Sequence, residues 1–116
     1  MNLGRQGEEI ALRYLEKKGY ELVAKNFRYE RAEIDIIVKD EIRKVLVFAE
    51  VKTRTSRLFG EAQESVVMRK QNQIIKSAQG FLMEHGEYAE YEKRCDVVAV
   101  YIRNGKEEIV HFENAF

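Results

Sequence analysis

The chain has 116 residues, and its 20 Lys and Arg residues balance its 20 Asp and Glu residues. This length predicts one domain over residues 1–116, and the neutral charge excludes a surface that attracts polyanions everywhere, so nucleic acid would need a local basic patch. A single cysteine, Cys95, excludes an internal disulfide and a cysteine-based zinc site, and only two histidines are present.

The first half of the chain predicts one helix and three strands. An amphipathic pattern from Leu3 to Lys18, followed by Gly19, predicts the helix and its end. Strands are expected from Tyr20 to Arg28, from Glu33 to Lys39 and from Val45 to Thr53. The third of these strands is apolar on both faces, which is typical of the centre of a sheet covered on both sides.

The second half predicts another helix and a hairpin. The helix is expected from Met68 to Glu84, and the acidic stretch from Glu84 to Glu92 is expected to be a solvated connector. Strands follow from Cys95 to Ile102 and from Glu107 to Phe112, joined at Asn104-Gly105. The order α-β-β-β-α-β-β predicts an α/β fold with a mixed central sheet of about five strands flanked by helices.

The chain carries no feature that predicts secretion or membrane insertion. It has no run of about 18 apolar residues, the length that spans a bilayer, and its first nine residues include charges and no apolar stretch. We therefore expect a cytoplasmic protein.

Four charged residues stand inside the two most apolar strands. Because side chains alternate along a strand, Glu33 shares a face with Asp35, and Glu50 shares a face with Lys52. A hairpin turning symmetrically at residues 42–43 would place Asp35 opposite Glu50 and Glu33 opposite Lys52. Opposed residues have Cβ atoms about 4.5–5.5 Å apart, so the two carboxylates would repel each other.

A hard divalent cation resolves this repulsion. Mg²⁺ is commonly held by one or two carboxylates together with water and substrate phosphate, and it stabilises charge that develops on a phosphate. Lys52 on the same face would orient the attacking water and offset the growing negative charge. The pattern therefore predicts phosphodiester hydrolysis. The alternative interpretation is that these residues form ordinary ion pairs on a half-exposed strand.

Short motifs along nearly the whole chain resemble the YraN-like family of small bacterial proteins, which are uncharacterised or proposed endonucleases of the PD-(D/E)XK nuclease superfamily. The resemblance implies a restriction-endonuclease-like fold similar to that of archaeal Holliday-junction resolvases. The chain departs from the family pattern at Ala32 and Cys95, and neither position is a catalytic group. The motifs are Gly4-Arg5-Gln6-Gly7-Glu8, Asn26-Phe27-Arg28, Glu33-Ile34-Asp35, Glu50-Val51-Lys52-Thr53-Arg54, Phe59-Gly60 and Cys95-Asp96-Val97-Val98.

The resemblance also implies roles for individual residues. Asp35 and Glu50 look like the acids that bind Mg²⁺ or Mn²⁺, and Lys52 looks like the signature lysine. The carbonyl of Val51 would be a further ligand, and Glu8 matches an acid that resolvase-like nucleases carry on a helix near the metal. The alternative for Glu8 is an acid in the first helical turn, which the helix dipole favours.

Several cations are candidates for contact with phosphates, and Arg54 is preferred because it continues the face of Lys52 toward the sheet end. The alternative for each is a solvated surface charge. Asp96 is interpreted as a cap at a strand start rather than as an acid supporting the site, and His85 and His111 are given no catalytic role. The other candidate cations are Arg5, Arg28, Arg57, Arg69, Lys70 and Lys76.

The leading hypothesis is a metal-dependent endonuclease acting on DNA, with branched or single-stranded intermediates as candidate substrates. Because a neutral chain has little overall attraction for DNA, binding would draw on a homodimer or a protein partner. The alternative is a nuclease-fold protein that binds nucleic acid or a partner without cutting. A glycosidase using the carboxylate pair is disfavoured, since the chain has no tryptophan to form a sugar platform.

Overall fold

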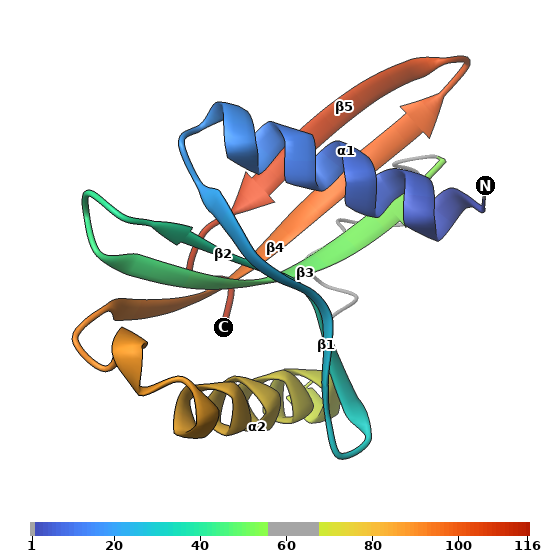
Figure 1. Cartoon of the computed structure of the whole chain (residues 1–116). Helices are drawn as coiled ribbons and strands as arrows, with labels where there is room; N and C mark the ends of the chain where they lie inside the picture. The colour runs from blue at the N-terminus through green and yellow to red at the C-terminus, as the bar shows by residue number, and fades with distance from the viewer. Residues whose placement is uncertain (1, 56–67) are drawn as a thin grey trace.

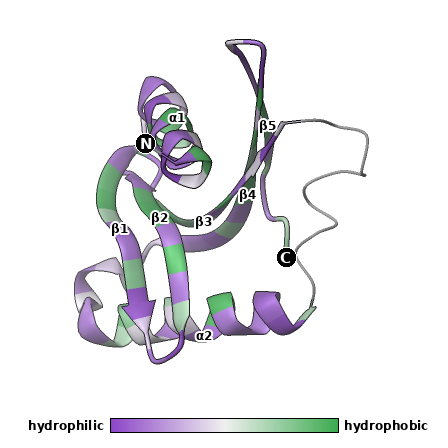
Figure 2. Ribbon diagram, turned by 90° about the vertical axis from the view of Figure 1, so that its right-hand side faces the viewer, coloured by the Kyte–Doolittle hydropathy of each residue, from purple (hydrophilic) through white to green (hydrophobic). Residues whose placement is uncertain are grey.

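The computed structural model describes residues 2–55 and 68–116, which form a five-stranded sheet with one helix on each face (Figures 1 and 2). The strand order is β1-β2-β3-β4-β5; β3 and β4 run parallel, and the other neighbours run antiparallel. The predicted α/β fold with a mixed sheet and its element order are confirmed. The elements are α1 (Leu3–Lys17), β1 (Glu21–Tyr29), β2 (Ala32–Asp40), β3 (Val45–Arg54), α2 (Met68–Glu84), a 3₁₀ turn (Gly86–Tyr88), β4 (Glu92–Arg103) and β5 (Lys106–Phe112).

Helix α1 has local signals at both ends. The side chain of Asn2 accepts a hydrogen bond from the backbone N–H of Arg5 at 2.8 Å, which caps the helix. After Lys17 the chain leaves the helix through Gly19, whose φ of +99° is a conformation that glycine adopts without strain. The predicted helix and its end are both confirmed.

The central strand β3 is buried on both faces, as predicted. Val47 and Ala49 pack with α1 in one cluster, whereas Phe48 packs with Phe81 of α2 in the other. Phe48 is 1% exposed, and truncating such a residue to alanine typically costs about 3–5 kcal/mol. The residues of β3 that follow this two-sided core are the ones predicted to carry chemistry.

Helix α1 lies unusually close to the sheet at Gly7. A Cβ atom at this position would overlap the side chain of Thr53 on β3, so a larger residue would force the helix or the strand to move. The absence of a side chain at Gly7 therefore sets how closely α1 approaches the end of β3. Glu8, the next residue, is carried by the same turn of helix.

Three expectations for the region around β4 need correction. The stretch expected to be a solvated connector contains the 3₁₀ turn, and Tyr88 in that turn is buried against Phe81. Strand β4 begins at Glu92, earlier than Cys95, because its parallel pairing with β3 already starts there. Asp96 consequently lies inside the strand and is not a cap at its start.

The β4–β5 hairpin turns where the sequence predicted it. Asn104 and Gly105 have φ values of +51° and +74°, which suit a two-residue hairpin turn. Figure 2 shows this end of the hairpin as hydrophilic, in purple. Within the part of the chain that the structure describes, no helix combines the length and apolar character needed to cross a membrane.

Candidate active site

The candidate site lies where strand β2 leaves strand β3. Their ladder runs from the Asp40–Val45 pair to the Ile36–Ala49 pair, and all its pairs follow the predicted register. Beyond Ala49, β3 continues only beside β4, while β2 continues beside β1 as far as its start. The two strands therefore form a fork at the point where the predicted catalytic residues begin.

The fork changes the pairing that was expected beyond this point. Asp35 and Glu50 are the first residues outside the ladder and are not a paired position. Glu33 pairs instead with Arg28 of β1, and the Arg28 Nε lies 3.3 Å from a Glu33 carboxylate oxygen. The expectation that Glu33 faces Lys52 is wrong, because β2 has already separated from β3 there.

Asp35 nevertheless reaches across the fork to β3. Its Oδ2 accepts a hydrogen bond from the backbone N–H of Val51 at 2.8 Å. This N–H belongs to the strand just past the last paired residue, so a side chain takes the place of the missing ladder partner. The contact fixes the carboxylate of Asp35 beside β3, next to Glu50.

Glu50 is a buried carboxyl group that the protein does not fully satisfy. It is 5% exposed, and among the described residues its Oε2 has no hydrogen-bond partner. The nearest ammonium group, Nζ of Lys70 on α2, lies 4.0 Å away. Burial raises the pKa of Glu50 to about 8, with a further contribution from Asp35, while Lys70 and Lys52 act in the opposite direction.

Lys52 follows Glu50 on the same face of β3 and is half-buried. Its positive charge favours the ionised form of Glu50 and so opposes the rise in the pKa of that carboxyl group. The predicted proximity of Asp35, Glu50 and Lys52 at one end of the sheet is thus present, although the fork rather than a continuous ladder brings it about.

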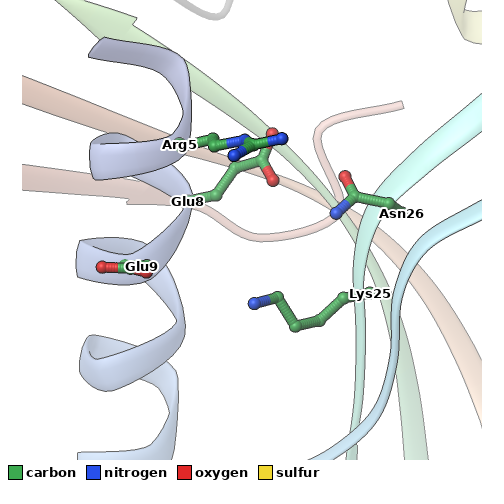
Figure 3. A pocket seen from close by; sticks show the side chains of 5 residues that line it. All are labelled: Arg5, Glu8, Glu9, Lys25 and Asn26. Carbon is green, nitrogen blue, oxygen red and sulfur yellow. The ribbon is translucent and has the colours of Figure 1, made fainter. Parts of the chain in front are cut away.

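Glu8 approaches the fork from α1. Figure 3 shows its side chain pointing toward Asn26 of β1 across a small groove. With the amide oriented to satisfy both carboxylates, the Asn26 nitrogen donates to Glu8 at 3.2 Å and to Glu33 at 3.1 Å. Burial raises the pKa of Glu8, and the neighbouring charges of Asp35 and Glu33 raise it further.

Asn26 is a functional candidate that the sequence analysis did not single out. Its φ of +51° lies in the left-handed region, and the β1–β2 ladder lacks a pair at this position, which lies opposite Asp35. Asparagine adopts this conformation more readily than most residues. An asparagine inside a predicted strand could have indicated a break in the strand pairing, but the pattern of the neighbouring residues favours a strand.

The groove between α1 and β1 has a volume of about 310 Å³ and carries both signs of charge (Figure 3). Two cations, Arg5 and Lys25, line it together with Glu8, Glu9 and Asn26. The charge of Lys25 favours ionisation of Glu8 and so lowers its pKa. Lys25 was not predicted as a site residue, since an isolated lysine in a strand gives no distinctive signal.

The donor set at the fork fits a hard divalent cation. Two carboxylates, one with a buried oxygen lacking a partner, match the one or two carboxylates that typically hold Mg²⁺. Across residues 2–55 and 68–116, no three acidic, histidine or cysteine side chains form a group able to hold a metal. Asp35 and Glu50 thus offer two carboxylates and no third protein ligand of these types within the described residues, and the roles of Asp35, Glu50, Glu8 and the Val51 carbonyl as metal ligands stay predictions.

The predicted phosphate-binding cations are not equally available. Lys70 faces Glu50, Arg28 pairs with Glu33, and Lys76 pairs with Glu30 at 2.9 Å. The guanidinium of Arg54 donates to the carbonyl of Thr53 at 2.9 Å. The remaining candidates are Arg5, which lines the α1–β1 groove, Arg69, which is exposed on α2, and Arg57, which lies outside the described residues.

Comparison with known proteins identifies the family. The profile of an uncharacterised protein family, UPF0102, matches residues 7–100. The chain belongs to UPF0102. A UPF0102 protein of Desulforamulus reducens is 42% identical over 97% of this chain and 93% of its own length, and one of Chlorobium phaeobacteroides is 42% identical over 98% and 92%. The resemblance inferred from the motifs is confirmed, and the names of these relatives state no activity.

A second buried acid of this UPF0102 chain lies on the opposite face of the sheet. Asp96 of β4 is fully buried and accepts hydrogen bonds from Arg94 at 2.9 and 3.0 Å and from the backbone N–H of Asn114 at 3.1 Å. His111 Nε2 lies 2.7 Å from it, and the other ring nitrogen contacts Tyr14 of α1 at 3.3 Å. Burial opposes the ionisation of Asp96, but the bonds to His111 and Arg94 outweigh it and lower its pKa.

Proposed function

We propose that this UPF0102 chain is a metal-dependent nuclease that hydrolyses phosphodiester bonds in DNA. The observation that carries the proposal is the Glu50 carboxylate, which is buried beside Asp35 and has one oxygen that meets no hydrogen-bond partner within residues 2–55 and 68–116. A buried carboxylate in this state costs free energy unless it takes up a proton or a cation completes it, and a divalent cation is the partner that would keep it ionised. The acid pair lies where the β2–β3 ladder ends, directly after the Ile36–Ala49 pair.

Asp35 and Glu50 would hold Mg²⁺ or Mn²⁺ together with oxygens of the substrate phosphate. When bound there, the ion supplies Lewis-acid stabilisation of the negative charge that develops on the phosphate. The Val51 N–H fixes the Asp35 carboxylate in advance, so less reorganisation is needed when substrate arrives. Because its pKa is raised to about 8, Glu50 would have to release a proton near neutral pH in order to hold an ion there.

Lys52 would position the attacking water and stabilise the transition state. Its ammonium group lies on the same face as Glu50, so it is directed toward the side of the fork where the phosphate would bind. A positive charge placed beside a phosphate in a water-poor site stabilises the extra negative charge of the transition state. Lys70 adds a second positive charge near Glu50 from helix α2.

The DNA backbone would follow local cations rather than a uniformly basic surface. Arg5 and Lys25 line the groove next to the fork, and Arg69 is exposed near the start of α2. These charges lie on both sides of the acid pair. Because the whole chain is neutral, we expect weak, strongly salt-dependent binding by one copy, which a homodimer or a protein partner would strengthen.

The test is cleavage of supercoiled plasmid and branched DNA with Mg²⁺ or Mn²⁺. We expect wild type to cut and Asp35→Asn and Lys52→Ala each to lose at least about 100-fold in rate, because each removes a charge that acts on the reacting phosphate. Glu16→Gln and Lys17→Ala, exposed changes on the far end of α1, are the matched controls and should retain activity.

Two results would contradict the proposal. One is cutting that persists in both site variants, which would identify a contaminating nuclease. The other is the absence of cutting with either metal while wild type and variants bind DNA equally. This second result would favour the alternative function, a nuclease-fold protein that binds without cleaving.

A further inference from the structure

A second groove lies on the α2 side of the molecule, beside the turn between β1 and β2. Figures 1 and 2 both place this turn next to α2. The groove has a volume of about 500 Å³, within the range of roughly 300–1,000 Å³ that is usual for small-ligand pockets. Its lining residues are Tyr29, Glu30, Arg31, Ala32, Gln73 and Lys76.

The lining combines an aromatic ring, an amide and two cations. We propose that this groove binds an unpaired nucleotide of the DNA strand that is cut at the fork. The inference rests on the nuclease function proposed above and adds that the substrate is single-stranded near the scissile phosphate. The motifs that predicted the catalytic residues contain none of the residues that line this groove.

Tyr29 supplies a fixed aromatic surface. It is half-buried, and one side of its ring lies against the backbone of α2 at Gly80, where a Cβ atom would overlap it. A ring held in this way presents its remaining surface to the groove without losing further side-chain freedom on binding. Bases stack on such rings regardless of sequence, and they do so only when unpaired and free of neighbours in a duplex.

The polar groups around the ring suit the rest of a nucleotide. Gln73 offers both a donor and an acceptor for the edge of a base. Arg31 and Lys76 outnumber the single acid, Glu30, so the groove carries an excess positive charge for a phosphate. Lys76 pairs with Glu30, and their side chains are 61% and 56% exposed. Exposed ion pairs of this kind contribute little stability, so a phosphate can replace Glu30 as the partner of Lys76.

The position of the groove relates it to the acid pair. Lys70, near the start of α2, lies 4.0 Å from Glu50, while Gln73 and Lys76 of the same helix line the groove. At 1.5 Å per residue these two residues lie about 4.5 and 9 Å further along the helix axis. Both places thus border the first half of α2, and on this basis we infer that one strand engages the groove and the fork together, which would favour strands that are unpaired beside the cut.

The experiment measures binding without cleavage. A short fluorescent oligothymidylate and a duplex of the same length are titrated with the full chain in EDTA and followed by anisotropy. We expect Tyr29→Leu, which keeps apolar volume against Gly80 but loses the ring face, to weaken single-strand binding by about 5- to 100-fold. Tyr29→Phe keeps the ring and should stay within about twofold of wild type. Duplex binding should not change.

A second pair of variants protects the test against misfolding. If Tyr29→Leu does not fold, Gln73→Ala takes its place as the test of the groove. Its control is Gln79→Ala, an exposed change on the same helix outside the groove. We expect a selective loss of single-strand affinity only for Gln73→Ala. Unchanged single-strand binding in Tyr29→Leu or, where that variant does not fold, in Gln73→Ala overturns the inference, as does an equal loss on duplex.

The readout also separates this inference from the proposed function. Binding in EDTA does not depend on cutting, so a strand-selective effect of Tyr29→Leu would stand even if no metal supported hydrolysis. Conversely, cleavage that requires Asp35 and Lys52 but is indifferent to the groove variants would leave the nuclease in place and remove the nucleotide subsite.

Discussion

Two buried acids on neighbouring central strands, Asp96 and Glu50, are treated in opposite ways by the surrounding structure. Asp96 faces α1 and is surrounded by donors from Arg94, His111 and the backbone of Asn114, and its pKa is lowered. Glu50 faces α2, has an oxygen without a partner among the described residues, and its pKa is raised to about 8. Within the part of the chain that the structure describes, Asp96 has donors for both of its oxygens, whereas Glu50 does not.

Under the proposed function, the difference separates an acid that serves the fold, Asp96, from one that would be available for chemistry, Glu50. Donors that complete Asp96 come from β4 itself, from β5 and from the segment after it, so the acid ties these parts together. At Glu50 the neighbouring strand has moved away and left another carboxylate, Asp35, as the neighbour. Burial alone therefore does not identify a functional acid; the number of donors that meet it does.

The largest effect is expected from breaking the complete site. Asp96→Asn removes the negative charge between Arg94 and His111 and leaves the Arg94 guanidinium with Glu113 as its acidic partner. Removing one member of a buried ion pair typically costs about 3–5 kcal/mol. Chemical denaturation should show a loss of this size, together with a lower melting temperature. A stability equal to wild type would show that Asp96 does not hold the fold.

The incomplete site should respond in the opposite direction. A raised carboxyl pKa means that the folded chain binds a proton more tightly than the unfolded chain, so stability falls as pH rises from 4.5 toward about 8. Without metal, Glu50→Gln should be more stable than wild type by roughly 1–3 kcal/mol above pH 8, and the gain should disappear near pH 4.5. Urea unfolding across this range, with Glu16→Gln as control, measures it. A gain that does not change with pH would contradict the raised pKa.

Binding of a divalent ion should be coupled to the same proton. Because Glu50 must ionise, apparent affinity for Mn²⁺ should rise by up to about tenfold per pH unit below pH 8 and then level off. Calorimetry in buffers of different ionisation enthalpy should detect proton release on binding. The release should be absent in Glu50→Gln. Affinity that does not vary with pH would mean that the ion binds away from Glu50.

The smallest effect is expected at Lys70. Its side chain is 41% exposed and its ammonium group lies 4.0 Å from Glu50, so solvent screens much of the attraction. Lys70→Met should raise the pKa of Glu50 further, by less than about one unit, with little change in stability. A carbon-detected NMR titration of the Glu50 side chain measures this. A lowered pKa would show that another group controls the carboxyl.

Local pattern was sufficient to predict the sheet and part of the site. Alternating apolar residues and a symmetric turn set the β2–β3 register, and the Asn104-Gly105 turn set the final hairpin. The fork was not predictable, because the strand patterns of β2 and β3 both continue past their last paired residues, Ile36 and Ala49. For the same reason Asp35 and Glu50 were correctly expected near each other, but as a ladder pair, which they are not.

Longer-range groupings escaped the sequence analysis. Asp96, His111 and Asn114 come from separate segments, and no spacing in the sequence links them, so Asp96 was interpreted as a cap. Asn26 stands in a segment whose neighbours have strand character, so its left-handed conformation was hidden. These residues are brought together only by tertiary packing, which propensity and periodicity do not encode.

The close contact of Gly7 with Thr53 has a consequence for how the chain tolerates change. A side chain at position 7 would have to displace α1 or the end of β3, and a displacement of α1 would also move Glu8 away from Asn26. A substitution at Gly7, which would touch neither metal nor substrate, would then disturb the placement of Glu8 indirectly. The lack of a side chain at position 7 thus allows α1 and β3 to stay in close contact.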